Sequence, residues 1–571
     1  MKGTELFIKG LKEEKVNTLF AYPGSAVITL FDELYKQKDI RMILPRHEQA
    51  LVHSADGYAR ATGKTGVCLV TSGPGATNIV TGIATANYDS VPLVCFCGQV
   101  RRDLIGNDAF QEVDIVGITR GITKHSMMVT DRRQLGRAMK EAFYIAATGK
   151  PGPVVVDLPV DMLNESGQDS YPKEVNIRSY HPSKKPHIGQ IKRAAALLKK
   201  ARKPLFLAGG GIHAGNAAEE FSELVKQTGI PVISTIMGKG AIGSDHPLYI
   251  GNLGMHGCFA ANRAVMECDV LCAVGSRFND RITGKVDGFA PHARIIHIDI
   301  DPASISRNVK VDIPIVADAR SAVTELAKYV EGSNISAWLN EISLWQEEHP
   351  LAAEKEAEKG QGFSPAAIIN LLNQIVSDGI IVTDVGQHQM WTAQYLKLNR
   401  NKRLLTSGGL GTMGYGLPAA IGAKLGKPEK QVICITGDGG IQMNIQELAT
   451  AVMEEIPVTV LILNNGCLGM VRQWQSLMFD RHYAGTDLKS GNLGQNQPRQ
   501  YIPDFVRLAD SYRAIGTRVS SIAELAAALN TAKHETRRPT IIECMIDREA
   551  IVLPMVKAGC ALNEMILGDV I

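Results

Sequence analysis

Two short polar motifs in the last third of the chain have residue types suited to binding a metal ion and a phosphate group. A Gly-Asp-Gly tripeptide centred on Asp438 follows the apolar run Val432–Thr436, and an Asn-Asn pair ending at Asn465 follows the apolar run Val458–Leu463. If both runs are parallel strands, Asp438 and Asn465 meet at one edge of a sheet, where open α/β sheets bind ligands. A carboxylate and an amide oxygen suit Mg²⁺, and phosphate oxygens can complete its octahedron. Either motif alone is more typical of a tight turn, but the two together favour a binding site.

The elements that must position this site are predicted from the pattern of apolar residues. Short apolar runs alternate with amphipathic stretches, which is the pattern of βαβ units with a parallel sheet. Besides the two runs above, strands are expected at Val16–Ala21, Met42–Leu44, Gly66–Thr71, Leu93–Cys97, Ile295–Ile298, Ile380–Thr383 and Thr540–Met545, and in the run that opens at Pro204. We therefore predict an α/β fold of three doubly wound parallel-sheet domains in tandem.

The domains are expected at residues 1–165, 190–335 and 362–550, followed by a tail at 551–571. From Met162 to about Lys203 the chain is polar and contains three prolines, which is typical of a linker. The charged stretch from Glu341 to Gly360 is interpreted as a solvated helix face between the second and third domains.

Composition excludes several classes of protein. The chain has 571 residues, 61 Lys+Arg against 58 Asp+Glu, and 45% hydrophobic residues, which excludes wholesale disorder. A net charge of +3 argues against bulk binding to nucleic acid or to an anionic membrane. The ten cysteines, among them Cys95, Cys97, Cys268, Cys272 and Cys434 in apolar runs, are interpreted as reduced buried thiols of a cytoplasmic protein. We expect no signal peptide, transit peptide or membrane span.

The Gly-Asp-Gly and Asn-Asn motifs, at this spacing, resemble the thiamine diphosphate signature of the decarboxylase and carboligase superfamily. The resemblance implies that Gly437, Gly439 and Gly440 contact the diphosphate. It also implies that Mg²⁺ is held by Asp438, Asn465 and the main-chain oxygen of Cys467. It further implies a glutamate in the first domain that hydrogen-bonds the aminopyrimidine, promotes its imino tautomer and so tunes the base that removes the thiazolium C2 proton. Glu48 matches that position, although without the resemblance it is more typical of a helix N-terminus.

The same superfamily implies further contacts with the cofactor. Met413, in a glycine-rich loop, matches the hydrophobic residue beneath the thiazolium, although a methionine is usually core filler. Gly386, Gln387 and His388 are expected to meet the diphosphate, with a structural role as the alternative for His388. Because Glu48 and Asp438 lie in different domains, the resemblance implies active sites shared between subunits of a homodimer or homotetramer.

Longer segments are similar to the catalytic subunit of acetohydroxyacid (acetolactate) synthases, over essentially the whole chain and in the biosynthetic, FAD-containing branch. They include Ala21-Tyr-Pro-Gly, Leu44-Pro-Arg-His-Glu-Gln, Thr71-Ser-Gly-Pro-Gly-Ala-Thr-Asn, Gly254-Met-His-Gly, Arg277-Phe-Asn-Asp-Arg and Leu468-Gly-Met-Val-Arg-Gln-Trp-Gln. The resemblance implies that pyruvate is decarboxylated on thiamine diphosphate. It implies next that the hydroxyethyl carbanion condenses with pyruvate to 2-acetolactate or with 2-ketobutyrate to 2-aceto-2-hydroxybutyrate, the first common step of valine, leucine and isoleucine biosynthesis. A separate small regulatory subunit is implied in the same way.

This branch binds FAD in its middle domain. From the residues, a glycine loop at Gly209 and Gly210 and a strand-end Asp299 that could take a ribose hydroxyl are weak signals. The resemblance adds Lys150, His256, Arg277 and Asp318 to the expected FAD contacts. A Rossmann-like domain without a ligand is the alternative.

Substrate contacts are implied for Gly24, Phe110, Gln111, Arg281 and Trp474. A 2-ketoacid carboxylate suits the guanidinium of Arg281, and Trp474 matches the residue that favours 2-ketobutyrate as acceptor. In isolation, Arg281 is more typical of a surface charge and Trp474 of a core aromatic residue.

The sequence departs from the family pattern at several positions. Ser25 stands at a glycine position, Lys150 at an arginine position, Val160 at a lysine position and Asn279 at an aspartate position, and the stretch from Gly485 to Gln500 is longer than usual. These changes bear on flavin affinity and substrate entry. The alternative functions are a flavin-linked pyruvate oxidase, a catabolic acetolactate synthase without FAD, and a non-enzymatic scaffold.

Overall fold

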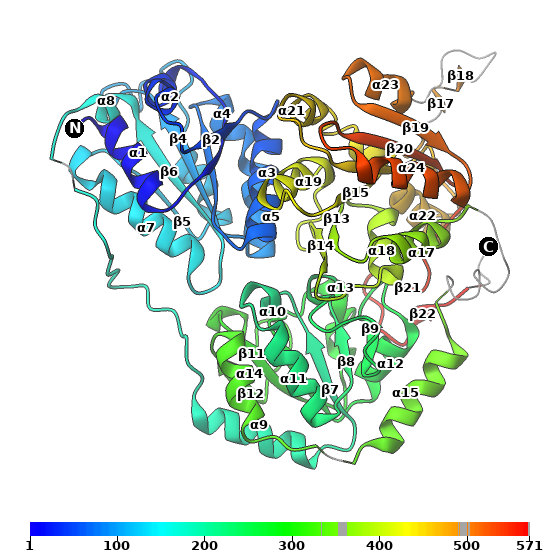
Figure 1. Cartoon of the computed structure of the whole chain (residues 1–571). Helices are drawn as coiled ribbons and strands as arrows, with labels where there is room; N and C mark the ends of the chain where they lie inside the picture. Colours follow the sequence, from blue (N-terminus) through cyan, green and yellow to red (C-terminus); the bar gives the residue numbers. More distant parts are fainter. Residues whose placement is uncertain are drawn as a thin grey trace.

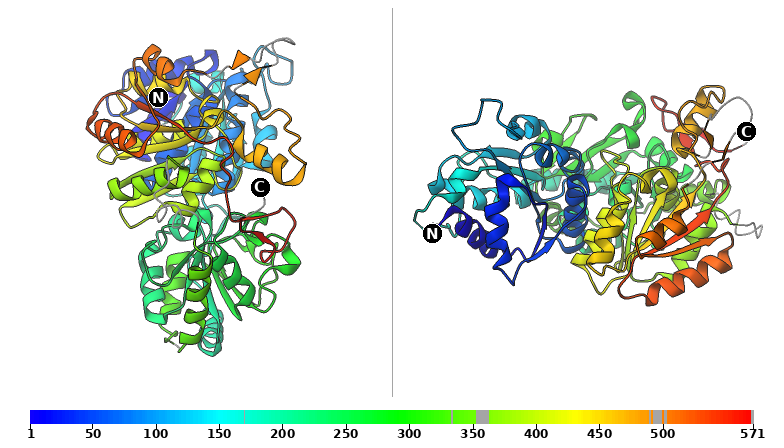
Figure 2. Two further views of the ribbon diagram at one scale, coloured as in Figure 1. Left: turned by 90° about the vertical axis from the view of Figure 1, so that its right-hand side faces the viewer. Right: turned by 90° about the horizontal axis from the view of Figure 1, so that it is seen from above.

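Three domains make up the chain, and each is built around its own sheet (Figure 1). The computed structural model describes residues 1–168, 170–332, 334–351, 363–488, 490–491, 499–500 and 503–568. The first and third domains lie side by side, and the middle domain packs beneath them (Figures 1 and 2).

The first domain is a parallel sheet of six strands in the order β2-β1-β3-β4-β6-β5. The central strands are buried on both faces because helices cover each side, as parallel sheets require. Its strands are β1 (Thr18–Ala21), β2 (Arg41–Ile43), β3 (Gly66–Val70), β4 (Leu93–Gln99), β5 (His125–Met128) and β6 (Pro153–Pro159), and its helices are α1 (Gly3–Glu13), α2 (Ile28–Tyr35), α3 (Glu48–Thr62), α4 (Pro74–Asn78), α5 (Val80–Asp89), α6 (Ile115–Thr119), α7 (Leu135–Ala147) and α8 (Val160–Asn164).

The middle domain has a parallel sheet of six strands in a different order, β12-β11-β10-β7-β8-β9, which is that of a dinucleotide-binding fold. Its strands are β7 (Pro204–Ala208), β8 (Val232–Ser234), β9 (Tyr249–Asn252), β10 (Val270–Val274), β11 (Arg294–Asp299) and β12 (Ile313–Val316), and its helices are α9 (Ile188–Lys200), α10 (Gly211–Ala214), α11 (Ala218–Thr228), α12 (Phe259–Glu267), α13 (Asp280–Thr283), α14 (Ala319–Ala327) and α15 (Ser336–Glu348).

The third domain repeats the topology of the first, because its strand order β14-β13-β15-β16-β20-β19 matches that sheet strand for strand. Its strands are β13 (Gly379–Thr383), β14 (Lys402–Thr406), β15 (Val432–Gly437), β16 (Thr459–Asn464), β19 (Ile515–Val519) and β20 (Thr540–Met545), and its helices are α17 (Pro365–Ile375), α18 (Gln387–Tyr395), α19 (Gly416–Gly426), α20 (Asp438–Ile441), α21 (Glu447–Met453), α22 (Gly469–Met478), α23 (Phe505–Ser511) and α24 (Ile522–His534). The predicted α/β fold with three doubly wound parallel sheets is thus confirmed.

Two small antiparallel hairpins complete the described part of the chain. Strands β17 (Ser490–Gly491) and β18 (Arg499–Gln500) pair within the segment expected to be longer than usual, half of which lies outside the described residues. Strands β21 (Met555–Val556) and β22 (Met565–Ile566) pair in the tail. The tail returns to the middle domain, where the Val556 amide donates to the Met255 carbonyl at 2.8 Å.

The linker after the first domain is shorter than its polar composition predicts. Helix α9 lies inside the stretch expected to be a linker, and its residues Ile191, Ala194 and Leu198 are buried in the core of the middle domain. An amphipathic helix of this kind carries many exposed polar residues, which is why composition alone hides it. Residues 341–348 of the charged run expected between the second and third domains lie in α15, and residues 352–360 lie outside the described residues.

Helices α3 and α19 form the most extensive contact between the first and third domains. A Cβ atom on Gly57 of α3 would overlap the carbonyl oxygen of Ala419, and one on Gly422 of α19 would overlap the carbonyl oxygen of Ser54. The missing side chains therefore let the two helices pack at backbone distance. None of the described helices combines the length and the apolar composition needed to cross a membrane.

Candidate functional site

The predicted metal–phosphate site lies at one edge of the third sheet. Strands β15 and β16 are parallel neighbours, and they end at Gly437 and Asn464. Asp438 begins the short helix α20, is only 2% exposed, and accepts a hydrogen bond from the main chain of Asn465. The pairing expected from the sequence is therefore present in space.

The electrostatics of this edge suit a cation. Burial raises the pKa of Asp438 to about 7, because a carboxylate out of water is unstable without a positive partner. The side-chain oxygen of Asn465 accepts a hydrogen bond from the main-chain amide of Cys467 at 3.3 Å. Cys467 also lies close enough to Asp438 for the carboxylate charge to act on its thiol. Among the described residues, no three His, Cys, Asp or Glu side chains gather as a self-sufficient metal site. This incomplete oxygen set fits an ion such as Mg²⁺ that shares its coordination with phosphate.

The neighbouring backbone forms a tight cradle. A Cβ on Gly437 would lie 3.1 Å from the His388 ring, and one on Gly440 would lie 2.7 Å from the Asp384 carboxylate. A Cβ on Gly439 would meet Leu468 at 2.8 Å and the terminal carbon of Met413 at 3.7 Å. Met413 thus lies against Gly439, and its expected place beneath the thiazolium stays a prediction.

Gly386, Gln387 and His388 border this cradle at the start of α18. Burial lowers the pKa of His388 to about 3, so its ring is neutral, and its Nε2 is buried without a hydrogen-bond partner among the described residues. The Gln387 amide donates to Gln473 and to the Ala550 carbonyl, each at 2.9 Å, and its Oε1 accepts from Asn465 at 3.1 Å. The imidazole therefore has a free polar atom for a ligand, whereas Gln387 is already engaged.

Glu48 is the first residue of α3 and is 9% exposed. Its Oε2 accepts a hydrogen bond from the Asn78 side chain at 2.9 Å. The turn that leads into it is held by the third domain, because the Glu447 carboxylate accepts from the Arg46 amide at 2.9 and 3.1 Å. Within the described part of one chain, no hydrogen bond or ion pair joins Glu48 to Asp438.

Sequence reasoning missed Asn78 and Glu447. Asn78 ends the Thr71-Ser-Gly-Pro-Gly-Ala-Thr-Asn segment, so a signal was available there. Glu447 stands in an apolar helix, and its partner is 401 positions away in sequence.

A large cavity beside the middle domain, about 1240 Å³ in volume, reaches the first and third domains. Its lining includes six of the residues expected to contact FAD or substrate, namely Lys150, Gly210, Arg277, Arg281, Asp299 and Asp318. Gly209 packs against the Gly275 carbonyl and does not line the cavity, and His256, which is half-buried, is not part of the lining either. The cavity has the size for a dinucleotide.

Two charged groups of this cavity stand out. The Lys150 ammonium lies 3.4 Å from the Asp301 carboxylate, so a lysine at this position already has an acidic neighbour. Lys239, which the sequence analysis did not single out, lines the cavity although it is buried, and burial lowers its pKa to about 8. A buried ammonium at a cavity wall favours an anionic ligand.

The predicted substrate residues form two groups. The Arg281 guanidinium lies 5.8 Å from the centre of the Trp474 ring and contacts the Met255 sulfur at 3.4 Å. The indole nitrogen of Trp474 is buried without a partner among the described residues. The family resemblance assigns both residues to the second ketoacid, and in the structure they lie side by side.

The second group lies on the first domain. Gly24 packs on Thr71, and the Ser25 hydroxyl lies 3.5 Å from the Gln111 side chain. Gln111 has a positive φ of 61°. Phe110 beside it is 85% exposed, which is unusual for so large an apolar side chain. These residues stand near Glu48, since a Cβ on Gly75 would lie 3.5 Å from the Glu48 carboxylate and 2.8 Å from Thr71.

Comparison with known proteins accounts for these arrangements. Three models of thiamine pyrophosphate enzymes match the chain: the N-terminal TPP binding domain over residues 1–118, the central domain over 191–326 and the C-terminal TPP binding domain over 384–544. The acetolactate synthase of Mycobacterium leprae (strain TN) is 43% identical over 572 residues, which cover 99% of this chain and 90% of that protein.

The chain belongs to the acetolactate synthase family.

Two further members of the acetolactate synthase family carry names that mention a subunit. The acetolactate synthase isozyme 3 large subunit of Escherichia coli (strain K12) is 44% identical over 580 residues, covering 100% of this chain and 99% of that protein. The acetolactate synthase large subunit of Cyanidium caldarium is 44% identical over 578 residues, covering 99% and 96%. The predicted family membership is thus confirmed, and so is the expectation that the first and third domains are of the thiamine diphosphate-binding kind.

Proposed function

We propose that this chain is the catalytic subunit of a biosynthetic acetolactate synthase. It decarboxylates pyruvate and joins the remaining two-carbon unit to pyruvate or 2-ketobutyrate. The observation that carries the proposal is the meeting of Asp438 and Asn465 at one sheet edge, beside glycines and an unpartnered His388, in a chain of this family.

The residues of that edge have separate roles in the proposal. Asp438, Asn465 and the main-chain oxygen of Cys467 hold Mg²⁺, and Gly437, Gly439, Gly440, Gly386, Gln387 and His388 surround the diphosphate. Met413 supports the cofactor from below. When bound, thiamine diphosphate supplies the electron sink that lets pyruvate lose carbon dioxide.

Glu48 serves proton transfer in this proposal. Its Oε2 is already occupied by Asn78, so its other oxygen is the one available to accept a proton or a hydrogen bond from the cofactor's ring. Because Glu48 and Asp438 are in different domains, we propose that two copies of the chain complete each site, as a homodimer or a homotetramer.

FAD is proposed to occupy the cavity beside the middle domain. Lys150, Gly210, Arg277, Asp299 and Asp318 line it, and Gly209 packs behind its wall against Gly275. His256 is proposed as a further FAD contact from the family resemblance. Lys239 provides a further positive charge. The cavity volume supports a dinucleotide.

The second 2-ketoacid is proposed to bind at Arg281, with its alkyl group against Trp474; the 5.8 Å between guanidinium and ring supports this joint role. Phe110, Gln111 and Gly24 would form the opposite wall from the first domain. A small regulatory subunit is proposed as partner because relatives are named large subunits, and the free cysteines support a cytoplasmic location.

The proposal is tested by incubating the purified full chain with thiamine diphosphate, Mg²⁺ and pyruvate and measuring acetolactate. We expect Glu48→Gln to lower turnover by about 10²- to 10⁴-fold, the range for losing an acid–base group. Glu141→Gln, in a surface ion pair with Arg137, is the matched control and should retain full turnover. Rapid reduction of an artificial electron acceptor with release of acetate would instead identify a flavin-linked pyruvate oxidase. A protein without a flavin absorbance spectrum would contradict the FAD-containing branch.

A further inference from the structure

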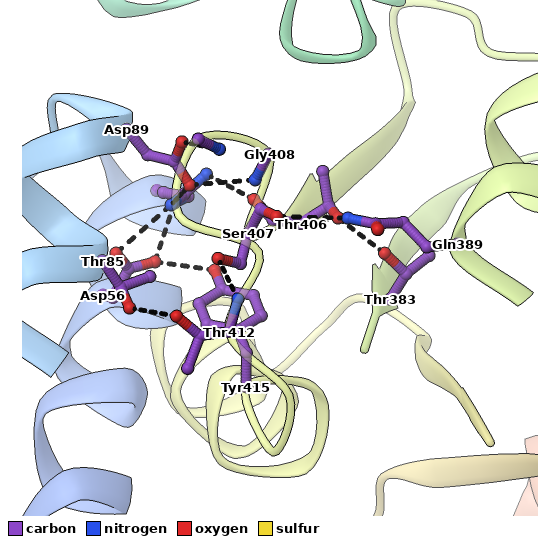
Figure 3. A network of polar contacts seen from close by, with 12 residues as sticks. Asp56, Thr85, Asp89, Thr383, Gln389, Thr406, Ser407, Gly408, Thr412 and Tyr415 are labelled. Atoms are coloured by element: carbon purple, nitrogen blue, oxygen red, sulfur yellow. Dashed lines mark hydrogen bonds and ion pairs between the residues drawn. The ribbon is translucent and has the colours of Figure 1, made fainter. Parts of the chain in front are cut away.

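A buried ion-pair cluster joins the first domain to the segment of the third domain that carries Met413 (Figure 3). Arg60 on α3 donates its Nε to Asp56 at 2.7 Å and one Nη to Asp89 at 2.9 Å. The side chain of Arg60 is 10% exposed, and both carboxylates are fully buried. Such desolvated, doubly paired groups hold one geometry much more firmly than a surface ion pair does.

This cluster of Arg60, Asp56 and Asp89 also hydrogen-bonds to the main chain of the third domain. The Asp89 carboxylate accepts from the amides of Gly409 at 2.7 Å and Gly408 at 3.2 Å. Another Nη of Arg60 donates to the Thr406 carbonyl at 3.0 Å. A main-chain amide that loses its hydrogen-bond partner inside the protein destabilises that arrangement, so these bonds fix where the loop at residues 407–415 begins.

The rest of this loop is held on both sides of Met413. The hydroxyls of Thr412 and Thr85 are 2.7 Å apart, which is a further hydrogen bond to the first domain. On the other side, the Gly414 amide donates to Asp384 at 3.0 Å within the third domain. Met413 therefore stands between one anchor from each domain, and its terminal carbon faces Gly439.

We propose that Arg60 and Asp89 are positioning residues, which set the 407–415 loop from the first domain and thereby place Met413 at the cofactor site. The role of Met413 at a cofactor site rests on the proposed function. The position of the 407–415 loop does not, because the contacts that set it lie within the chain.

The charges of the cluster allow a clean test. It contains one cation and two carboxylates, so Asp89→Asn removes the excess charge and leaves the Arg60–Asp56 pair intact. Burial also raises the pKa of Asp89, so a neutral side chain is compatible with this buried position. One Asp89 oxygen accepts from both Arg60 and Gly408, and the other accepts from Gly409. An asparagine can accept only one of the two loop amides, because its NH₂ group must face either Gly409 or the pair Arg60 and Gly408, all of which are donors.

Two measurements on the full chain compare wild type with Asp89→Asn. In protein free of cofactor, we expect hydrogen exchange at the amides of Gly408 and Gly409 to become at least about 10-fold faster, with α3 and α19 unchanged. With cofactors added, we expect the Michaelis constant for thiamine diphosphate to rise about 5- to 20-fold while kcat changes less than 3-fold. Arg41→Met is the matched control, because it removes another ion pair between the same domains, with Glu454 at 3.0 Å, and should alter neither quantity.

Several results would overturn the proposal. Exchange at Gly408 and Gly409 within twofold of wild type would show that Asp89 does not hold the loop. Faster exchange throughout α3 and α19 would show a general stabilising role instead. If Asp89→Asn does not fold, Arg60→Lys replaces it, since an ammonium keeps the charge but cannot reach Asp56, Asp89 and Thr406 together. Faster loop exchange in a chain without any response to thiamine diphosphate would refute the proposed function and leave the loop geometry standing.

Discussion

Replacing Glu447 with glutamine tests the contact that holds the turn before Glu48. The Glu447 carboxylate is fully buried and accepts from the Arg46 amide and, at 2.7 Å, from the Thr450 hydroxyl. Burial raises its pKa from 4.5 to about 7, against the effect of these hydrogen bonds. The folded protein therefore binds the proton more tightly than the unfolded chain does.

The sign and size of the effect follow from linkage. Because the folded pKa is the higher one, wild-type stability falls as the pH rises from 4.5 to about 7 and is lowest above that window. At 1.36 kcal/mol per pH unit, the whole window corresponds to about 3 kcal/mol. Glutamine does not titrate, so it escapes this loss. It accepts the Arg46 amide with one oxygen instead of two, which costs about 1 kcal/mol at every pH.

The assay compares thermal midpoints of wild type and Glu447→Gln at pH 5 and pH 8. One kcal/mol corresponds to roughly 2–4 °C for a domain of 150–250 residues. We expect the variant's midpoint, relative to wild type, to be about 4–10 °C higher at pH 8 than at pH 5. The control is Glu454→Gln, because Glu454 directly follows the same helix and its side chain is 17% exposed. It should show no such difference. An equal offset at both pH values, or one of opposite sign, would refute the reasoning.

Three other predictions concern the metal site, the domain contact and the first core. Asp438→Asn should weaken Mg²⁺-dependent binding of thiamine diphosphate by at least about 100-fold in a fluorescence titration, and EDTA should do the same to wild type. Gly57→Ala should lower the thermal midpoint by roughly 10 °C because its Cβ overlaps Ala419, whereas Gly121→Ala, with nothing within 4 Å, should shift it by less than about 2 °C. Asp157 is buried, and burial raises its pKa to about 7. Asp157→Asn should therefore stabilise the protein more at pH 8 than at pH 5, as measured by calorimetry.

The fold was predictable where a strand is uniformly apolar. Runs such as Ile380–Thr383 and Val432–Thr436 lie at the centre of a sheet, and burial on both faces forces that composition. The edge strands β5, β14 and β19 escape the pattern, because they carry the exposed polar residues His125, Arg403 and Arg518.

The site was predictable only as far as local motifs reach. Asp438 and Asn465 end neighbouring strands, so their meeting follows from the topology. Glu447 and Asp89 could not be found in this way. Each is a single acidic residue that accepts a hydrogen bond from a main-chain amide hundreds of positions away. The amino-acid type at that distant position does not reveal that its amide is such a partner.

The backbone contact between α3 and α19 has a consequence for how substrates reach the interior. Gly57 packs against the Ala419 carbonyl and Gly422 against the Ser54 carbonyl, so the two helices meet backbone to backbone. No side chain lies between them at these points that could change conformation to let them move. Hinge closure requires a soft joint, and shear requires surfaces that slide. We expect the outer domains to travel as one rigid body, so entry and exit of small molecules must depend on surface segments opening and not on the halves of the molecule parting.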